Sequence, residues 1–374
     1  MDEVLVVVGP GVVADAALIG EVAEREFAAL GVAGSVVHAR DAARVAALLR
    51  PCAVVLPGPE PAVRELIGRP LGPLVWVDVE RADGVEAGEE ATHLHGRGVA
   101  GLAWGIRHAA HRLRHPGRRR VPYGPHRDQW GELYLPAAPA AAPPPVVALV
   151  HGGYWRSIWA ADLMEALCAD LTARGLAVWN LEYRRPDLHG WPATCEDVAA
   201  GLAALAGCGE PVDLGRLAVA GHSAGAQLAL RAAADGAPMA LAVSLAGVLD
   251  LVEATERWVS AGAVAAALGG PHEARPGRSA AAHAAALGGV RAPRPERYAA
   301  ASPLLRLPLG VPQLVVQGTA DDLDLLDVGR RYARAALRAG DEVTYLEMPG
   351  DHFDVITPRT PIWRAAAEAV TAAL

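Results

Sequence analysis

The stretch Leu217-Ala218-Val219-Ala220-Gly221-His222-Ser223-Ala224-Gly225 decides the fold of this chain. Its apolar start predicts a strand, and the residues that follow the pentapeptide predict a helix over 226–234. A Gly-x-Ser-x-Gly turn between a strand and a helix is typical of a nucleophile elbow, in which small residues allow a sharp turn. The positive end of the following helix favours negative charge that develops beside the serine.

The pentapeptide alone is a weak signal, because glycine and alanine are abundant in the chain. Its other interpretation is a tight turn in which Ser223 only caps the helix. Catalysis requires more, since serine is a poor nucleophile without a base that takes its proton and a third group that orients the base. The rest of the sequence must therefore decide between the two interpretations.

The composition indicates a large α/β protein. The chain has 374 residues, which is enough for two domains or for one large domain with insertions. Because 52% of the residues are hydrophobic, a substantial core can be buried. No apolar run reaches about 18 residues, and residues 1–5 lack the basic segment of a signal peptide, so we expect a soluble, cytoplasmic protein with no membrane partner. The net charge of −8 argues against a nucleic-acid partner.

Neither the cysteines nor the histidines follow a metal-binding pattern. The four cysteines are scattered without C-x-x-C spacing and are expected to be buried free thiols. His93 lies near His95, and His108, His111 and His115 form a second group, but neither group has an acidic or cysteine partner in a recognisable pattern. We therefore expect no metal and no cofactor.

Strands and helices alternate in two consecutive segments, which predicts parallel sheets covered on both faces. The first segment, residues 1–115, has predicted strands at 4–8, 35–38, 53–56 and 74–79 and predicted helices at 16–30, 42–49 and 98–114. Residues 116–122, which include Arg118-Arg119-Arg120, are interpreted as a solvated linker. The second segment, residues 123–374, has predicted strands at 146–150, 177–181, 217–220, 242–245, 313–317 and 342–347.

Two connections in the second segment are distinctive. Residues 137–145 are rich in alanine and proline and are predicted to form a hairpin loop between strands at 132–135 and 146–150. Residues 249–308 are rich in alanine and interrupted by prolines. An insertion of this length between late strands is predicted to be a helical cap over the site.

Two late loops offer an acid and a base for Ser223. Asp321 and Asp322 follow the strand at 313–317, and His352 follows the strand at 342–347. The order serine, acid, histidine is that of a hydrolase built on an α/β sheet. Two other histidines after Ser223, His272 and His283, fall in the predicted cap and are weaker candidates for the base.

The loop His151-Gly152-Gly153-Tyr154-Trp155 follows the strand at 146–150. Loops of this kind supply backbone N–H groups that stabilise the negative charge on an acyl oxygen, and losing one such donor costs about 2.7–4 kcal/mol. The predicted donors of this oxyanion hole are Gly152, Gly153 and Ala224. A simple tight exit from the strand is the other interpretation, but the joint occurrence with the elbow, the late aspartate and the late histidine favours catalysis.

With these motifs, the sequence from about residue 123 onward resembles α/β-hydrolases of the kynurenine formamidase (arylformamidase) kind. The motifs that carry the resemblance are His151–Trp155, Glu182-Tyr183-Arg184, Trp191-Pro192-Ala193-Thr194, Gly221–Gly225, Gly318–Asp321 and Asp351-His352-Phe353. The resemblance implies an α/β-hydrolase fold and a Ser-His-Asp triad.

The resemblance also implies residue roles. Ser223 would attack the acyl carbon, His352 would act as base and then as acid, and Asp321, which the family spacing Gly-x-x-Asp selects over Asp322, would hold the imidazole. Gln317 stands where relatives often carry histidine, and we expect it not to touch the triad. Tyr154 and Trp155 would lie near the acyl pocket, whereas three further tryptophans would line an aromatic substrate site or equally pack in the core: Trp159, Trp191 and Trp258.

Residues 3–115 faintly resemble type II dehydroquinate dehydratase, which has a flavodoxin-like fold. The resemblance rests on residues 4–10, on the strand at 53–56 with its Pro-Gly exit, and on residues 95–101 before the last helix. The family's catalytic tyrosine and arginine are absent from the first loop, residues 11–15, and its histidine from the loop at 57–61. We therefore expect the fold without the chemistry, and a scaffold role or homo-oligomerisation through this domain.

Together, these motifs predict a serine hydrolase that cleaves a small acyl amide or ester through an acyl-enzyme. The alternatives are a general carboxylesterase, an acyl transferase in a biosynthetic pathway, or a catalytically silent binding protein. The expected partner is a small-molecule acyl substrate.

Overall fold

The computed structural model describes residues 3–137, 142–272 and 293–374. The chain forms two compact units, Met1–Gly117 (unit 1) and Arg118–Leu374 (unit 2). In the described part of the chain, every helix is too short or too polar to cross a lipid bilayer. Each unit has its own sheet and its own hydrophobic core.

Unit 1 is built on a parallel sheet with the strand order β2-β1-β3-β4-β5, which is the flavodoxin-like order. Its strands are β1 (Glu3–Val8), β2 (Ala33–His38), β3 (Val54–Leu56), β4 (Val75–Asp78) and β5 (Thr92–His95). The central strands are apolar on both faces because helices cover both. Val4, Val6 and Val8 belong to one core cluster with α1 (Ala16–Leu30) and α4 (Ala100–Arg114), whereas Leu5 and Val7 belong to another with α2 (Ala42–Leu48) and α3 (Pro61–Ile67).

Unit 2 is built on an eight-stranded sheet with the order β13-β12-β11-β10-β8-β9-β7-β6. Its strands are β6 (Arg119–Pro122), β7 (Trp130–Tyr134), β8 (Pro145–Val150), β9 (Ala177–Leu181), β10 (Asp213–His222), β11 (Leu241–Leu245), β12 (Gln313–Gly318) and β13 (Val343–Met348). The pairs from β9 to β13 are parallel, and β7 pairs antiparallel with β6 and β9. The carboxyl ends of the parallel strands therefore share one edge of the sheet.

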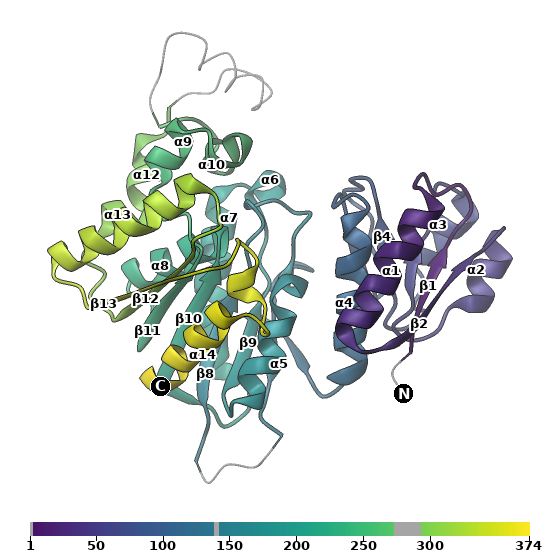
Figure 1. Cartoon of the computed structure of the whole chain (residues 1–374), viewed down its shortest axis with the longest axis horizontal. Helices are drawn as coiled ribbons and strands as arrows, with labels where there is room; N and C mark the ends of the chain where they lie inside the picture. The colour runs from purple at the N-terminus through teal and green to yellow at the C-terminus, as the bar shows by residue number, and fades with distance from the viewer. Residues whose placement is uncertain (1–2, 138–141, 273–292) are drawn as a thin grey trace. The chain divides into compact units, whose positions relative to one another are not determined.

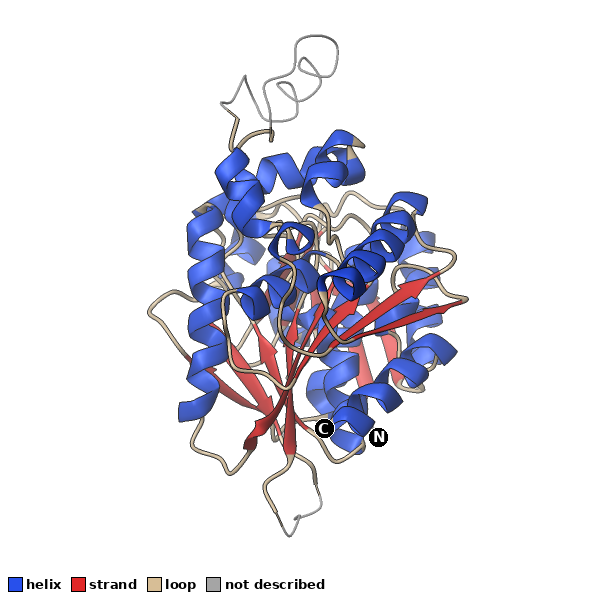
Figure 2. Ribbon diagram, turned by 90° about the vertical axis from the view of Figure 1, so that its left-hand side faces the viewer, coloured by secondary structure: helices blue, strands red, loops and turns tan. Residues whose placement is uncertain are grey.

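Helices cover both faces of this sheet, as Figures 1 and 2 show. On one face, Val146, Ala148 and Val150 of β8 join a core cluster with α7 (Trp191–Ala204), α8 (Ala224–Ala234) and α13 (Leu323–Ala339). On the other, α5 (Glu165–Ala173) and α14 (Pro361–Ala373) lie side by side, and Trp363 Nε1 donates to Asp170 Oδ2 at 2.8 Å. Four shorter helical elements adjoin these helices along the chain: η1 (Ala161–Met164), α6 (Pro186–His189), η2 (Leu205–Gly207) and η5 (Asp354–Ile356).

The described part of residues 249–308, the predicted cap, is mainly helical. It contains α9 (Leu251–Glu256), η3 (Val259–Gly262), α10 (Ala263–Leu268), α12 (Pro295–Ala301) and η4 (Pro303–Arg306), and α9, α10 and α12 gather at one end of unit 2 in Figure 1. Tyr298 joins them, since its hydroxyl lies 3.0 Å from Thr255 Oγ1 and 3.2 Å from the carbonyl oxygen of Gly270. Residues 273–292 of the predicted cap, with His283, lie outside the described residues.

The predicted hairpin across residues 137–145 is wrong. β7 pairs with β9 rather than with β8, because β9 lies between them in the sheet. β7 and β8, although consecutive along the chain, therefore lie on opposite sides of β9 in the sheet. The sequence suggested a hairpin because the two strands are neighbours along the chain, but a local pattern does not specify which strands pair.

The three arginines of the predicted linker are also not simply solvated. Arg119 to Pro122 form β6, and the buried carboxylate of Glu132 lies 3.1 Å from Arg120 Nη2 and 3.5 Å from Arg118 Nε. The guanidinium of Arg120 also lies 3.8 Å from the centre of the Trp130 ring. A carboxylate buried at this edge of the sheet requires cationic partners, and the arginines provide them.

Gly131 of β7 lies where the neighbouring strand β9 leaves no room for a side chain. A Cβ atom at this position would lie 2.1 Å from Cζ2 of the fully buried Trp179 on β9. We expect Gly131→Ala to lower the free energy of unfolding by about 1–3 kcal/mol, because the buried ring must move. Urea denaturation followed by circular dichroism measures this change.

Gly207→Ala is the matched control, because a Cβ atom there would meet nothing within 4 Å. Equal stability of the two variants would contradict the packing argument.

Candidate active site

The turn at Ser223 has the backbone of a nucleophile elbow. Ser223 follows β10 directly, precedes α8, and has φ 53° and ψ −116°, a conformation that non-glycine residues rarely adopt. Its amide donates to the carbonyl oxygen of Leu245 at the end of β11 at 2.8 Å. The side chain is therefore held at the carboxyl edge of the sheet, on a residue that is only 3% exposed.

Glycines are required on both sides of Ser223 because three backbones meet there. A Cβ atom on Gly221 would lie 2.1 Å from the carbonyl oxygen of Gly225. One on Gly225 would lie 2.1 Å from the carbonyl oxygen of Val150, at the end of β8. The elbow is thus packed directly against the start of the His-Gly-Gly loop.

Asp321 and His352, the predicted acid and base, are hydrogen-bonded. His352 Nδ1 lies 2.9 Å from Asp321 Oδ2 and 3.1 Å from Oδ1, and the Asp321 side chain is only 2% exposed. Nδ1 therefore donates to the carboxylate. The other ring nitrogen, Nε2, is then the atom that can accept a proton. Asp322, the competing acid, caps α13 instead, since its Oδ1 accepts from the amide of Asp324 at 2.8 Å.

Gln317 corrects one expectation from the sequence. Its Nε2 donates to Asp321 Oδ2 at 2.8 Å, so it touches the predicted acid. Gln317 is buried on β12, four residues before Asp321, and the chain turns back between them. The Asp321 amide donates to the carbonyl oxygen of Gly318 at 3.3 Å in this turn. The sequence showed that Gln317 replaces the usual histidine, but it did not show that the turn brings Gln317 back to Asp321.

The His-Gly-Gly loop lies against Ser223. A Cβ atom on Gly152 would lie 3.1 Å from Ser223 Cβ and 2.6 Å from the carbonyl oxygen of His222. Gly153 has φ 108°, and Ala224 is the first residue of α8, where backbone N–H groups have no acceptor within the helix. The three residues predicted as oxyanion donors are thus all within the loop or the helix turn that adjoin the serine.

A buried ion pair supports this loop. His151 Nε2 lies 3.1 Å from Glu182 Oε1, and Arg185 donates to the same carboxylate. Burial alone would raise the pKa of Glu182, but the Arg185 and His151 partners hold it below its usual range. Tyr183 adds a hydrogen bond of 2.7 Å to the carbonyl oxygen of His151. Glu182-Tyr183-Arg184 is one of the motifs behind the family resemblance, but the sequence pattern indicates no role for it.

His222 is a residue of the site that the sequence analysis did not assign. Its Nε2 donates to the carbonyl oxygen of His352 at 2.9 Å, and the two imidazole rings are 4.8 Å apart. Burial, together with the His352 ring, lowers the pKa of His222 well below 6.5, so its ring is neutral at pH 7. The residue before the serine therefore holds the loop that carries the predicted base. In the sequence, the only indication of a role for His222 is its position beside Ser223 in the Gly-x-Ser-x-Gly pentapeptide.

The five predicted substrate-binding aromatic residues separate into two groups. Trp155 and Trp191 are 2% and 6% exposed and belong to the core cluster, and Trp155 Nε1 donates to Gln227 Oε1 at 3.0 Å. Trp191 thus matches its packing alternative, and Trp155, which was expected near the acyl pocket, also packs in the core. Tyr154, Trp159 and Trp258 retain exposed surface, and the Trp159 side chain lies against Gly153 of the loop.

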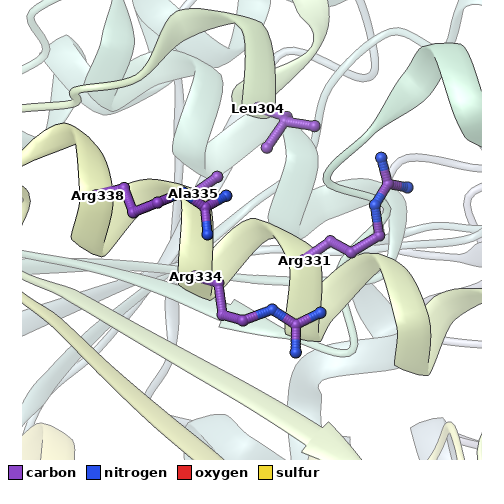
Figure 3. A pocket seen from close by; sticks show the side chains of 5 residues that line it. All are labelled: Leu304, Arg331, Arg334, Ala335 and Arg338. Carbon is purple, nitrogen blue, oxygen red and sulfur yellow. The ribbon is translucent and has the colours of Figure 1, made fainter.

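A separate cavity of about 230 Å³ lies beside α13 and contains none of these residues. Figure 3 shows the side chains around it, which come from one face of α13 and from η4: Arg331, Arg334, Ala335, Arg338 and Leu304. Three arginines line it, and one of them, Arg331, is ion-paired with Asp250 at 3.2 Å. It is therefore a surface feature distinct from the residues around Ser223.

Solved structures share the fold of unit 2. Esterase B from Lactobacillus rhamnosis has a TM-score of 0.54 and 19% identity, over 73% of this chain and 92% of that chain. The hyperthermophilic esterase from the archaeon Pyrobaculum calidifontis has a TM-score of 0.50 and 21% identity, over 68% and 84%. A bacterial heroin esterase has a TM-score of 0.52 and 26% identity, over 69% and 83%.

None of the curated proteins matches the chain. A family model described as alpha/beta hydrolase fold matches residues 147–356, which is more than half of the 374 residues. The matched range contains the elbow, the late aspartate and the late histidine. The chain therefore belongs to the α/β-hydrolase fold family.

Proposed function

We propose that unit 2 is a serine hydrolase that cleaves small acyl esters, and aryl formamides among acyl amides, through a Ser223-His352-Asp321 triad. The observation that carries this proposal is the hydrogen bond of 2.9 Å from His352 to Asp321, in a loop that His222 ties to the elbow. If Ser223 only capped the helix, an oriented imidazole in a loop tied to the elbow would have no purpose. The family match and the similarity to the bacterial heroin esterase also support hydrolysis of an ester.

The proposed reaction has two stages. Ser223 Oγ attacks the acyl carbon while its proton passes to His352 Nε2, and N–H groups of Gly152, Gly153 and Ala224 stabilise the oxyanion. His352 then gives the proton to the leaving alcohol or amine, whose bond to the acyl carbon breaks. Water, deprotonated by the same imidazole, attacks the acyl-enzyme and releases the acid and Ser223. Asp321 stabilises the imidazolium in both stages.

The choice of substrate rests on aromatic residues at the glycine loop and in the predicted cap. Tyr154, Trp159 and Trp258 offer partly exposed aromatic surface, which suits an aryl leaving group or an aryl acyl group. The sequence resemblance favours an N-formyl aryl amine, whereas the names of the similar structures favour esters. A general carboxylesterase that ignores formamides, and an acyl transferase that uses an alcohol in place of water, are the competing enzyme functions.

Ser223→Ala tests the nucleophile. We expect kcat/KM for p-nitrophenyl acetate, and for N-formylkynurenine if it is cleaved, to fall at least about a thousandfold, because the acyl-enzyme cannot form. The far-ultraviolet circular dichroism spectrum should not change. Ser157→Ala is the control, because the hydroxyl of the half-buried Ser157 donates to Asp187 at 2.9 Å and has no part in the proposed triad.

Retained activity in Ser223→Ala would refute the proposed nucleophile. Turnover of p-nitrophenyl acetate without any turnover of N-formylkynurenine would refute the formamidase part and leave the carboxylesterase. Failure of the wild type on both substrates, with no labelling by a fluorophosphonate, would favour the silent binding protein.

His222→Leu tests whether the residue before the serine positions the base. The substitution keeps a buried side chain of similar size but removes the donor to the His352 carbonyl oxygen. Because misplacing a catalytic group by about 1 Å costs roughly a hundredfold in rate, we expect kcat to fall by up to that factor with little change in KM. Steady-state kinetics with p-nitrophenyl acetate measures both constants.

His222→Gln, whose amide can donate to the same oxygen, should retain most of the activity. If His222→Leu turned over like the wild type, or if both variants lost activity equally, the positioning role would be wrong.

We propose that unit 1 has no catalytic role of its own and serves as a scaffold for self-association. In the flavodoxin-like order, ligands bind between the loops after β1 and β3. Here those loops touch, since a Cβ atom on Gly9 would lie 2.5 Å from the Pro57 carbonyl oxygen and one on Gly58 2.4 Å from that of Pro10. Light scattering should give a smaller assembly for a chain that starts at Arg118 than for the full chain, and equal assemblies would contradict this role.

A further inference from the structure

Two imidazoles and one carboxylate, none of them among the residues proposed for catalysis, gather in unit 2. His126 and Asp128 lie between β6 and β7, and His189 is the last residue of α6. Their possible ligand atoms all lie within 4.8 Å of one another. The two imidazole rings are 4.6 Å apart, edge to face. The sequence does not indicate this group, because His189 is distant along the chain from the other two residues.

We propose that His126, Asp128 and His189 bind a divalent transition-metal cation such as Zn²⁺. Two nitrogen donors and one carboxylate oxygen suit Zn²⁺, Co²⁺ or Ni²⁺, whereas Mg²⁺ and Ca²⁺ prefer oxygen ligands throughout. Three protein ligands leave at least one coordination position for water. His189 is exposed and the other two residues are half-buried, so the ion can enter from solvent.

The hydrogen bonds around the three residues show which possible metal-ligand atoms already have a partner. The amide of Asp128 donates to His126 Nδ1 at 3.1 Å, so the lone pair of this ring is on Nδ1 and a metal would take the place of the amide. Arg185 Nη2 donates to Asp128 Oδ2 at 3.1 Å, and Arg127 Nε lies 3.8 Å from Oδ1, so a metal ion would bind Oδ1 on the side away from Arg127. Arg185 also donates to Glu182 and to the Tyr183 carbonyl oxygen, and so remains paired if Asp128 moves.

The geometry requires a small adjustment. Bonds of about 2.0–2.2 Å around a tetrahedral zinc ion place ligand atoms roughly 3.3 Å apart, so side chains that are up to 4.8 Å apart must close by about 1.5 Å. The exposed His189 can make this movement by rotating its side chain. The bound metal would then join the β6–β7 connection to α6, two segments that the His126–His189 ring contact and Arg185 already bring together.

Metal titration of the full chain tests the proposal. Protein that has been treated with EDTA and desalted is titrated with ZnCl₂ by calorimetry, its melting temperature is measured with and without ZnCl₂, and CoCl₂ is used to read visible absorption bands. We expect His189→Ala to weaken zinc binding at least about tenfold and to abolish the zinc-dependent rise in melting temperature. Asp128→Asn should weaken binding in the same direction.

Two controls separate this site from other histidines and from catalysis. His38→Ala removes an exposed histidine of unit 1 and should bind zinc like the wild type. Ser223→Ala should also bind zinc like the wild type, so failure of the proposed hydrolase would not affect this result. Wild-type protein without zinc-dependent heat or stabilisation, or unchanged zinc binding by His189→Ala, would overturn the proposal.

Discussion

The close approach of three backbones at Ser223 constrains the rest of unit 2. A Cβ atom on Gly221 or Gly225 would lie 2.1 Å from a carbonyl oxygen, so β10, α8 and the loop after β8 meet without side chains between them. Ser223 adopts a strained backbone at this junction, which costs about 1–3 kcal/mol and persists only where surrounding packing enforces it. The buried parallel strands on either side of β10 supply that packing.

Buried polar groups then fix the loops that surround the junction. Glu182 holds His151 at the start of the glycine loop, and Arg185 compensates the buried carboxylate. His222 ties the elbow to the loop of His352, while Gln317 and His352 share the carboxylate of Asp321. Such pairing keeps charged groups inside the protein at tolerable cost and holds donors in place before a substrate arrives.

Local patterns in the sequence were enough for the elements and their order. The apolar runs of β9 and β12 predicted strands within a residue of their bounds, and the small residues around Ser223 predicted the elbow. The flavodoxin-like fold of unit 1 and the α/β-hydrolase fold of unit 2 are confirmed. The pairing of β7 with β9 and the contact of Gln317 with Asp321 were not predictable, because each depends on how the chain returns on itself. The same holds for His126, Asp128 and His189, which meet only in the folded unit.

If Ser223 is the nucleophile, an organophosphate that reacts with activated serines should trap it covalently. The full chain is incubated with the organophosphate paraoxon, its intact mass is measured, and the modified peptide is identified by tandem mass spectrometry. We expect one diethylphosphoryl group per chain, attached to Ser223, with loss of esterase activity in proportion to labelling. Loss of activity with the label on another residue, or full esterase activity after stoichiometric labelling of Ser223, would contradict this role for Ser223.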